Sequence, residues 1–122
     1  MMQPKAKSKA VSEFTENELR YLMDRSLARL AFLCEDMQAH IMPVLFEFDG
    51  QNFYLSGWNL RYSQRFQSIP KKSHVTLLID DINDSVRWTP RGIEISGTAE
   101  AREDGDYYYV LVKPVNKTSW GV

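Results

Sequence analysis

The sequence has a single cysteine, no long apolar run and no excess of one charge, and each absence excludes a class of protein. Cys34 alone can form neither an internal disulfide nor a cysteine-based zinc site. No stretch approaches the roughly 20 apolar residues that span a bilayer, and the basic N-terminal residues lead into no apolar signal region. A net charge of -1 argues against binding nucleic acid or an anionic membrane by bulk charge. We expect a cytoplasmic protein with no nucleic-acid or membrane partner.

Motifs for nucleophilic or metal-dependent catalysis are also missing. The spacings HxxxH, CxxC and HExxH do not occur, and no glycine-rich phosphate loop is present. His40 and His74 lie far apart in the sequence, and the apolar run around Cys34 favours a buried, inert thiol. The acidic cluster from Asp80 to Asp84 lacks the glycine and final glutamate of a calcium loop, so we expect a solvated turn there. The sequence therefore predicts no catalytic side chain and no metal site.

A chain of 122 residues and 14.2 kDa is the size of one small domain. Residues 1–12 carry basic groups and no acid before position 13, and we expect a disordered lead-in followed by a single domain over residues 13–122. Thr15 followed three residues later by Glu18 has the spacing of a capping box, which predicts the start of a short amphipathic helix.

Beyond this helix, apolar residues follow the two-residue period of β-strands. Leu30–Cys34 is apolar at nearly every position, which is typical of a strand covered on both faces. Pro43 in the strand His40–Phe48 indicates an edge or a bulge, because proline cannot donate a ladder hydrogen bond. Further strands are predicted at 52–56, 75–79, 93–101 and 107–112, with a short extended piece at 119–120 and a short helix at 61–69. About six strands joined by tight turns favour a closed antiparallel barrel over a sandwich.

One stretch is unusual in its charge. The 30 residues between Asp49 and Asp80 contain no acid, yet they include five basic side chains: Arg61, Arg65, Lys71, Lys72 and His74. The same stretch offers the hydroxyls of Ser56, Tyr62 and Ser63 near the expected start of the short helix. Arginine, hydroxyl and backbone N–H groups together can cradle a phosphate. A solvated basic helix face explains the composition equally well.

The order of segments along the chain resembles a known family. The segments are FTENELRYL, LARLAFL, HIMPVLFEFDGQNFYLSG, RYSQRF, VTLLIDD, WTPRGIEISGTAEA and SWGV. They are similar to the pyridoxamine 5'-phosphate oxidase-like FMN-binding split β-barrel proteins, and among these to the small subgroup labelled deazaflavin (coenzyme F-420)-dependent oxidoreductases. The most specific pieces are Asp80–Gly97 and the closing SWG. The resemblance implies a mainly β fold, namely a split antiparallel barrel of about six strands with two or so short helices.

The resemblance also implies a homodimer with two cofactors in the grooves between the subunits. The phosphate position of the family corresponds to Ser63, Gln64 and Arg65 just after the third strand, and the basic stretch adds Arg61 and Tyr62 beside them as candidates. Relatives usually have lysine where this chain has Arg65, which keeps the charge and adds a bidentate fork. The ring of the cofactor would lie near Pro43, Val44 and Ser56, and Trp88 and Arg91 would reach it from the partner subunit.

A flavin or deazaflavin supplies hydride chemistry by itself, which agrees with the absence of an acid–base pair or nucleophile. The function predicted is a flavin- or deazaflavin-dependent oxidoreductase that transfers a hydride to or from a small-molecule substrate. The cofactor predicted is FMN, with coenzyme F-420 as the alternative. A non-catalytic flavin-binding protein, such as a carrier or sensor, is the alternative function. Binding of single-stranded nucleic acid by a small barrel is disfavoured by the net charge.

Overall fold

The computed structural model describes residues 7–10, 13–34, 36–56, 73–105 and 107–122. They form β1 (Lys7–Ala10), α1 (Glu16–Met23), β2 (Leu27–Leu33), β3 (Ala39–Phe48), β4 (Phe53–Ser56), β5 (Ser73–Asn83), the 3-10 helix η2 (Asp84–Val86), β6 (Thr89–Asp104) and β7 (Tyr107–Trp120). Within these ranges, no helix has both the length and the apolar character needed to cross a membrane.

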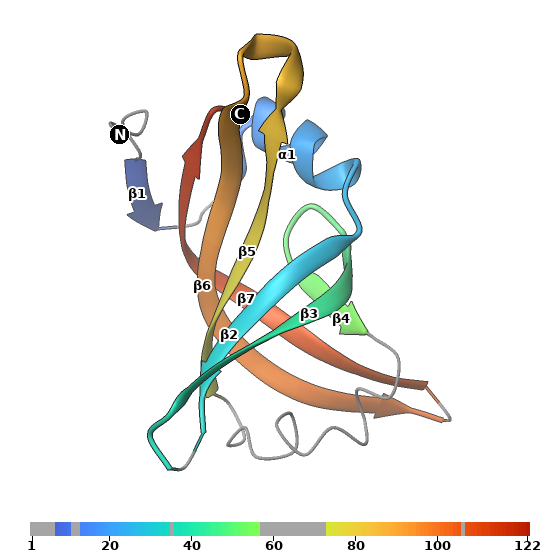
Figure 1. The fold of residues 1–122 in the computed structure, drawn as a ribbon. Coiled ribbons are helices and arrows are strands. Elements are labelled where there is room, and N and C mark those ends of the chain that lie inside the picture. The colour runs from blue at the N-terminus through green and yellow to red at the C-terminus, as the bar shows by residue number, and fades with distance from the viewer. Residues whose placement is uncertain (1–6, 11–12, 35, 57–72, 106) are drawn as a thin grey trace.

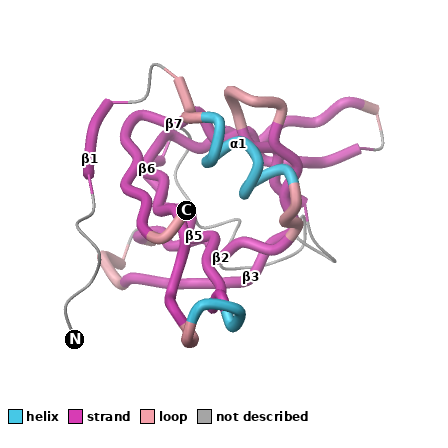
Figure 2. The backbone as a smooth tube through the Cα atoms, turned by 90° about the horizontal axis from the view of Figure 1, so that it is seen from above, coloured by secondary structure: helices cyan, strands magenta, loops and turns pink. Residues whose placement is uncertain are grey.

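Strands β2 to β7 close into an antiparallel barrel, which confirms the predicted fold class (Figures 1 and 2). The hydrogen-bonded order is β7-β4-β3-β2-β5-β6, and β6 pairs again with β7 along almost its whole length. The other edge of β7 is shared, because its first half pairs with β4 and its second half with β1. Closure leaves the barrel strands with few exposed edges, which suits a chain of this length.

Alternation along the strands forms the core. In β5 and β6 every second side chain is buried, and Ile93, Ile95 and Ala99 point inward as their spacing predicts. In β2 the inward residues Ala28, Leu30 and Phe32 are also buried. The prediction that this strand is covered on both faces is wrong for the single chain, because Leu27 and Leu33 on its outer face are about half exposed.

Helix α1 covers one end of the barrel, and its start is the predicted capping box. The backbone N–H of Glu18 donates to Thr15 Oγ1 at 3.1 Å, and the Thr15 N–H donates to Glu18 Oε1 at 2.8 Å. The Glu18 carboxylate is buried and also accepts a hydrogen bond from Lys117 Nζ of β7. This ion pair connects α1 to strand β7 of the barrel.

Three details differ from the sequence prediction. Lys7–Ala10 forms β1 rather than part of a disordered lead-in, because the second half of β7 offers an edge that a short strand can extend. β7 is one strand from Tyr107 to Trp120 rather than two pieces. Pro114 lies at a β-bulge, where a strand tolerates a residue that has no backbone N–H to donate. The helix predicted at 61–69 lies outside the described residues.

Candidate functional site

The outer face of β2 and β3 carries apolar side chains that the single chain leaves exposed. Leu27 pairs with Leu45 across the two strands, Arg29 pairs with Pro43 next on the same face, and Ala31 pairs with Ile41 after that. The side chains of Leu27, Leu45 and Ile41 are between 51% and 57% exposed. Contiguous apolar surface of this kind on a small protein marks a binding surface. We call Leu27, Ala31, Leu33, Ile41, Pro43 and Leu45 the outer apolar face.

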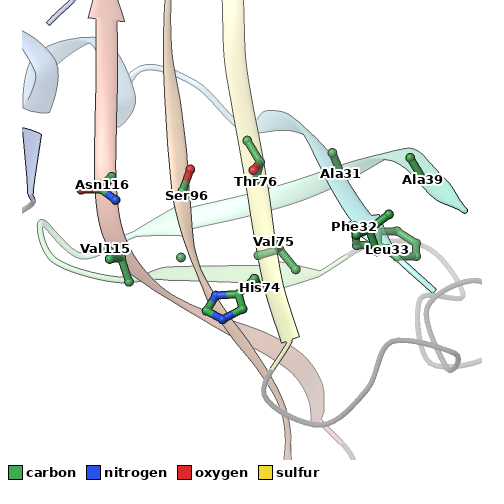
Figure 3. A pocket seen from close by; sticks show the side chains of 11 residues that line it. Ala31, Phe32, Leu33, Ala39, His74, Val75, Thr76, Ser96, Val115 and Asn116 are labelled. Carbon is green, nitrogen blue, oxygen red and sulfur yellow. The ribbon is translucent and has the colours of Figure 1, made fainter. Parts of the chain in front are cut away.

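A pocket of about 510 Å³ opens at the lower end of this face (Figure 3). One wall is apolar and includes Ala31, Leu33 and Ala39 from the β2–β3 hairpin. The other wall is a row of polar side chains, in which Thr76 of β5 pairs with Ser96 of β6, and Ser96 pairs with Asn116 of β7. An apolar wall opposite a few convergent polar groups is the usual composition of a small-molecule site, and the volume lies within the usual range.

A β-bulge shapes one side of this pocket. The register of β6 and β7 shifts between Ser96 and Gly97, so that Ser96 pairs with Asn116 and Gly97 pairs with Pro114. The extra residue of β7, Val115, lines the pocket together with Asn116. The bulge requires a glycine, because a Cβ at Gly97 would lie 2.3 Å from the carbonyl oxygen of Lys113. Bulges often redirect side chains next to functional sites, and this one does so here.

Strand β3 of the same face has an open stretch of edge, which begins beside the pocket. Residues 39–45 of β3 pair with β2, but β4 pairs only with Leu45–Phe48 on the opposite edge. Among the described strands, none pairs with that opposite edge at residues 39–44. Pro43 lies on this stretch, which confirms that it marks a local edge. Strand β4 ends at Ser56, which pairs with Leu45 beside the open edge. The predicted phosphate-binding segment follows Ser56 in the sequence.

A second polar cluster lies beside α1, around Asp81 of β5. Arg91 Nε and Nη2 donate to the two carboxylate oxygens at 2.7 and 3.0 Å, and Arg25 Nη2 lies 3.1 Å from Oδ2. The Tyr21 hydroxyl donates to Oδ1 at 2.8 Å, and both guanidinium groups lie over its ring, 4.5 Å and 5.3 Å from the centroid. The expectation of a turn is wrong for Asp80 and Asp81, because both lie within strand β5, and Arg29 pairs with Asp80 at 2.9 Å.

The hydrogen bonds from Arg91 are the main cause that holds the pKa of Asp81 at about 2, and they outweigh the opposing effect of burial. Burial, followed by the hydrogen bond to Asp81, raises the pKa of Tyr21 well above its usual value. Both groups therefore keep one protonation state at neutral pH. This cluster binds α1 to β5 and β6 rather than exchanging protons.

The predicted site residues fall into three groups. Arg61, Tyr62, Ser63, Gln64 and Arg65 lie outside the described residues. Pro43 is exposed on the outer apolar face and Ser56 is half-buried at the end of β4, whereas the Val44 side chain is buried in the core, so that only its backbone faces the open edge.

Trp88 and Arg91 form the third group. Trp88 is 72% exposed at the β5–β6 hairpin, where it and Arg87 both adopt left-handed backbone angles. Arg91 is engaged with Asp81 of its own chain. None of the predicted site residues that the structure describes lines the pocket. A contact of either residue with a cofactor of a partner subunit stays a prediction.

The sequence analysis missed the pocket residues Thr76, Ser96 and Asn116. Each is an ordinary outward-facing polar residue of a strand, and only the register of three strands brings them into one row. The signal that could have located this wall is Gly97, a glycine inside a strictly alternating strand, because such a glycine often marks a bulge.

Comparison with known proteins gives the fold and the family. No family model matches the chain. The 5a,11a-dehydrotetracycline/5a,11a-dehydrooxytetracycline reductase of Streptomyces rimosus is 30% identical over 119 residues, covering 89% of this chain and 84% of the reductase. The FAD-binding protein of Mycobacterium smegmatis superposes with a TM-score of 0.67 at 14% identity, covering 95% of this chain and 99% of that one.

A pyridoxamine 5'-phosphate oxidase candidate from Corynebacterium glutamicum superposes with a TM-score of 0.64 at 20% identity, covering 93% of this chain and 96% of that one. At such identities the two solved structures show a shared fold, and it is the barrel expected from the sequence. At 30% identity over most of both chains, this chain belongs to the same family as the reductase, and its fold is the split β-barrel of the pyridoxamine 5'-phosphate oxidase-like structures.

Proposed function

We propose that this protein is a reductase that uses a flavin or deazaflavin cofactor and acts on a small organic molecule. The observation that carries the proposal is the 30% identity to a tetracycline-derivative reductase over 89% of the chain. Two structural neighbours are FAD-binding proteins, from Mycobacterium smegmatis and Mesorhizobium loti, which supports a flavin as the cofactor class. The absence of catalytic motifs from the sequence agrees with chemistry carried by a cofactor.

The outer face of the barrel fits such a cofactor. A planar ring system needs an apolar surface for its face and hydrogen-bonding groups for its polar edge. The outer apolar face supplies the first at Pro43, and the open edge of β3 supplies the second through its backbone groups at residues 39–44, Val44 included. The phosphate would be held by the segment after Ser56, through Arg61, Tyr62, Ser63, Gln64 and Arg65. FMN and coenzyme F-420 are the two candidates, because both carry a ribityl phosphate.

When bound, a flavin or deazaflavin accepts and delivers a hydride at its ring. The residues of this chain would bind the cofactor, orient its ring and exclude water from it. Arg65 would anchor the phosphate by a bidentate contact, and Ser63 would donate its hydroxyl. The apolar side chains around Pro43 would exclude water from one side of the ring, and the pocket lined by Thr76, Ser96 and Asn116 would hold the substrate beside it.

We propose further that a second copy of the chain covers the outer apolar face. In a homodimer this surface would be buried, and the pocket on the same face would become an enclosed site between subunits. Trp88 lies on the β5–β6 hairpin, which projects beyond the barrel (Figure 1). In the homodimer, this hairpin of one copy would bring Trp88 and Arg91 to the cofactor of the other copy. With a single cysteine and no disulfide, we infer a cytoplasmic protein.

The phosphate assignment is tested by titrating FMN and coenzyme F-420 into the apoprotein of Arg65→Ala. We expect affinity to fall at least 10-fold, since a charged contact to phosphate contributes about 1.5–3 kcal/mol. The matched control is Arg102→Ala, an exposed arginine of β6 whose guanidinium lies 2.6 Å from Glu100, which should bind both cofactors like wild type. Equal affinity in Arg65→Ala and wild type would overturn the anchor assignment.

The second candidate is a non-catalytic flavin-binding protein. Two structural neighbours that are FAD-binding proteins favour it. Turnover separates the two functions. The protein loaded with reduced cofactor is mixed with 5a,11a-dehydrotetracycline, and cofactor oxidation is followed against a protein-free control. Reduction of this or a related conjugated substrate at catalytic rates supports the reductase, whereas cofactor binding without any turnover across a panel of such substrates supports the carrier or sensor.

A further inference from the structure

The hairpin that joins β2 to β3 brings together the side chains of Cys34, Asp36 and His40. The strands pair up to Leu33 and Ala39, and the backbone N–H of Cys34 then donates to the Gln38 carbonyl at 3.2 Å. The loop turns tightly, because the Met37 N–H donates to the Cys34 carbonyl at 2.9 Å and Met37 adopts a left-handed backbone angle, φ 64°. This turn, at the lower end of the barrel in Figure 1, places Cys34, Asp36 and His40 close together.

The three side chains are metal-ligand types at short separation. The Cys34 sulfur, an Asp36 carboxylate oxygen and a His40 ring nitrogen all lie within 4.8 Å of one another. Cys34 is buried, His40 is half-buried and Asp36 is exposed, so the group is closed on one side and open to solvent on the other.

We propose that this hairpin binds one divalent transition-metal ion, best a Zn²⁺ ion, through Cys34, Asp36 and His40. Thiolate, imidazole and carboxylate are the three ligand types of protein zinc sites, and three protein ligands leave a fourth position for water. The thiolate and carboxylate together carry the two negative charges that neutralise the ion. In a tetrahedral zinc site, sulfur and nitrogen ligand atoms lie about 3.5 Å apart, so closing on the ion requires movements of about 1 Å.

Two contacts position the ligands. One oxygen of Asp36, Oδ1, accepts the Gln38 N–H at 2.9 Å, which fixes the orientation of the carboxylate. The His40 ring stacks on Phe32, with ring centroids 5.8 Å apart and planes 23° apart. Neighbours that fix the orientation of metal ligands are typical of real sites. The site uses none of the residues predicted to hold the phosphate and does not depend on the proposed reductase function.

The test uses the tag-free full chain, reduced and freed of metal, titrated with Zn²⁺ by calorimetry and with Co²⁺ by absorption spectroscopy. We expect one ion per chain with micromolar or tighter affinity, and a thiolate-to-cobalt charge-transfer band that reports the Cys34 ligand. Cys34→Ser, Asp36→Asn and His40→Ala should each weaken Zn²⁺ binding at least 10-fold. The matched control is His74→Ala, the other histidine of the chain, which should bind like wild type.

No Zn²⁺ binding at micromolar concentration would overturn the site, and so would binding without the charge-transfer band. Equal weakening by His74→Ala would also overturn it, because the ion would then be held by a different set of groups. Unfolding curves of each variant in EDTA check that the fold is kept. Should Cys34→Ser fail to fold, the band in the wild-type protein and its loss in the exposed variant Asp36→Asn still decide the matter.

Discussion

Replacing Glu18 by glutamine isolates the charge of the buried ion pair between α1 and β7. The side chains of Lys117 and Glu18 are only 2% and 6% exposed, and the Lys117 ammonium also lies 4.8 Å from the centre of the Phe14 ring. Glutamine keeps an oxygen that can accept the Thr15 N–H, so the capping box survives. What is lost is the negative charge opposite Lys117.

An ammonium left buried without its partner costs about 3 kcal/mol, at the lower end of the range for broken buried pairs. With an unfolding entropy of about 2.1 cal/mol/K per residue over 122 residues, this corresponds to a fall in Tm of about 12 °C. The control is Glu16→Gln in the same turn of α1, whose side chain is 87% exposed and pairs with Arg20. It should lose no more than about 0.5 kcal/mol.

The assay is urea unfolding of both variants and wild type at one protein concentration, with thermal melts beside it. Burial opposes ionisation of Glu18, but its hydrogen bonds from Lys117 and Thr15 prevail and lower its pKa. The stability from this group is therefore present above its usual pKa and lost as the pH falls through the lowered value, and Glu18→Gln should lack that loss. A Glu18→Gln variant within 1 kcal/mol of wild type at pH 7 would refute the reasoning.

Three further predictions concern the barrel and its outer face. Asp81→Asn should lower the free energy of unfolding at pH 7 by only about 1 kcal/mol, because solvent screens the ion pair with Arg91. The folded-state pKa of Asp81 is about 2, so the difference from wild type should vanish as the pH falls below that value. Gly97→Ala should lower the free energy of unfolding in urea by at least about 2 kcal/mol, because the added Cβ would clash with the Lys113 carbonyl. Gly105→Ala has open space around the added Cβ and should lose only about 1 kcal/mol, because its backbone is left-handed. Ile41→Asp should shift a homodimer to monomer in sedimentation analysis, while Glu94→Asp, exposed on β6, should not.

The sequence predicts features that depend on neighbouring residues. Thr15 and Glu18 are three residues apart, and their capping box formed as expected. The alternation of Ile93, Ile95 and Ala99 is likewise a local pattern, and it identified the strand and its inward face correctly. The positive backbone angles of Gly50 and Gly105, φ 97° and 63°, agree with the tight turns expected between the strands.

Interactions between distant segments were not predictable in the same way. Glu18 and Lys117 are 99 residues apart, and neither side chain on its own indicates a buried ion pair. Asp81 follows an apolar strand and looks like the first residue of a turn, but β5 continues to Asn83 in register with β6, and Arg91 and Arg25 pair with its carboxylate. The Cys34, Asp36 and His40 group is local, but its spacing matches none of the metal motifs named above, and the turn of the hairpin brings the three side chains together.

The most direct test of the central claim is to identify the small molecule that the purified protein carries. The protein is denatured, and the released material is examined by visible absorption and by mass. We predict a flavin or deazaflavin, either FMN or the glutamylated coenzyme F-420, and binding of that compound when it is added back to the apoprotein. Release of no such compound, together with failure of both cofactors to bind at micromolar concentration, would contradict the account and leave only the barrel fold.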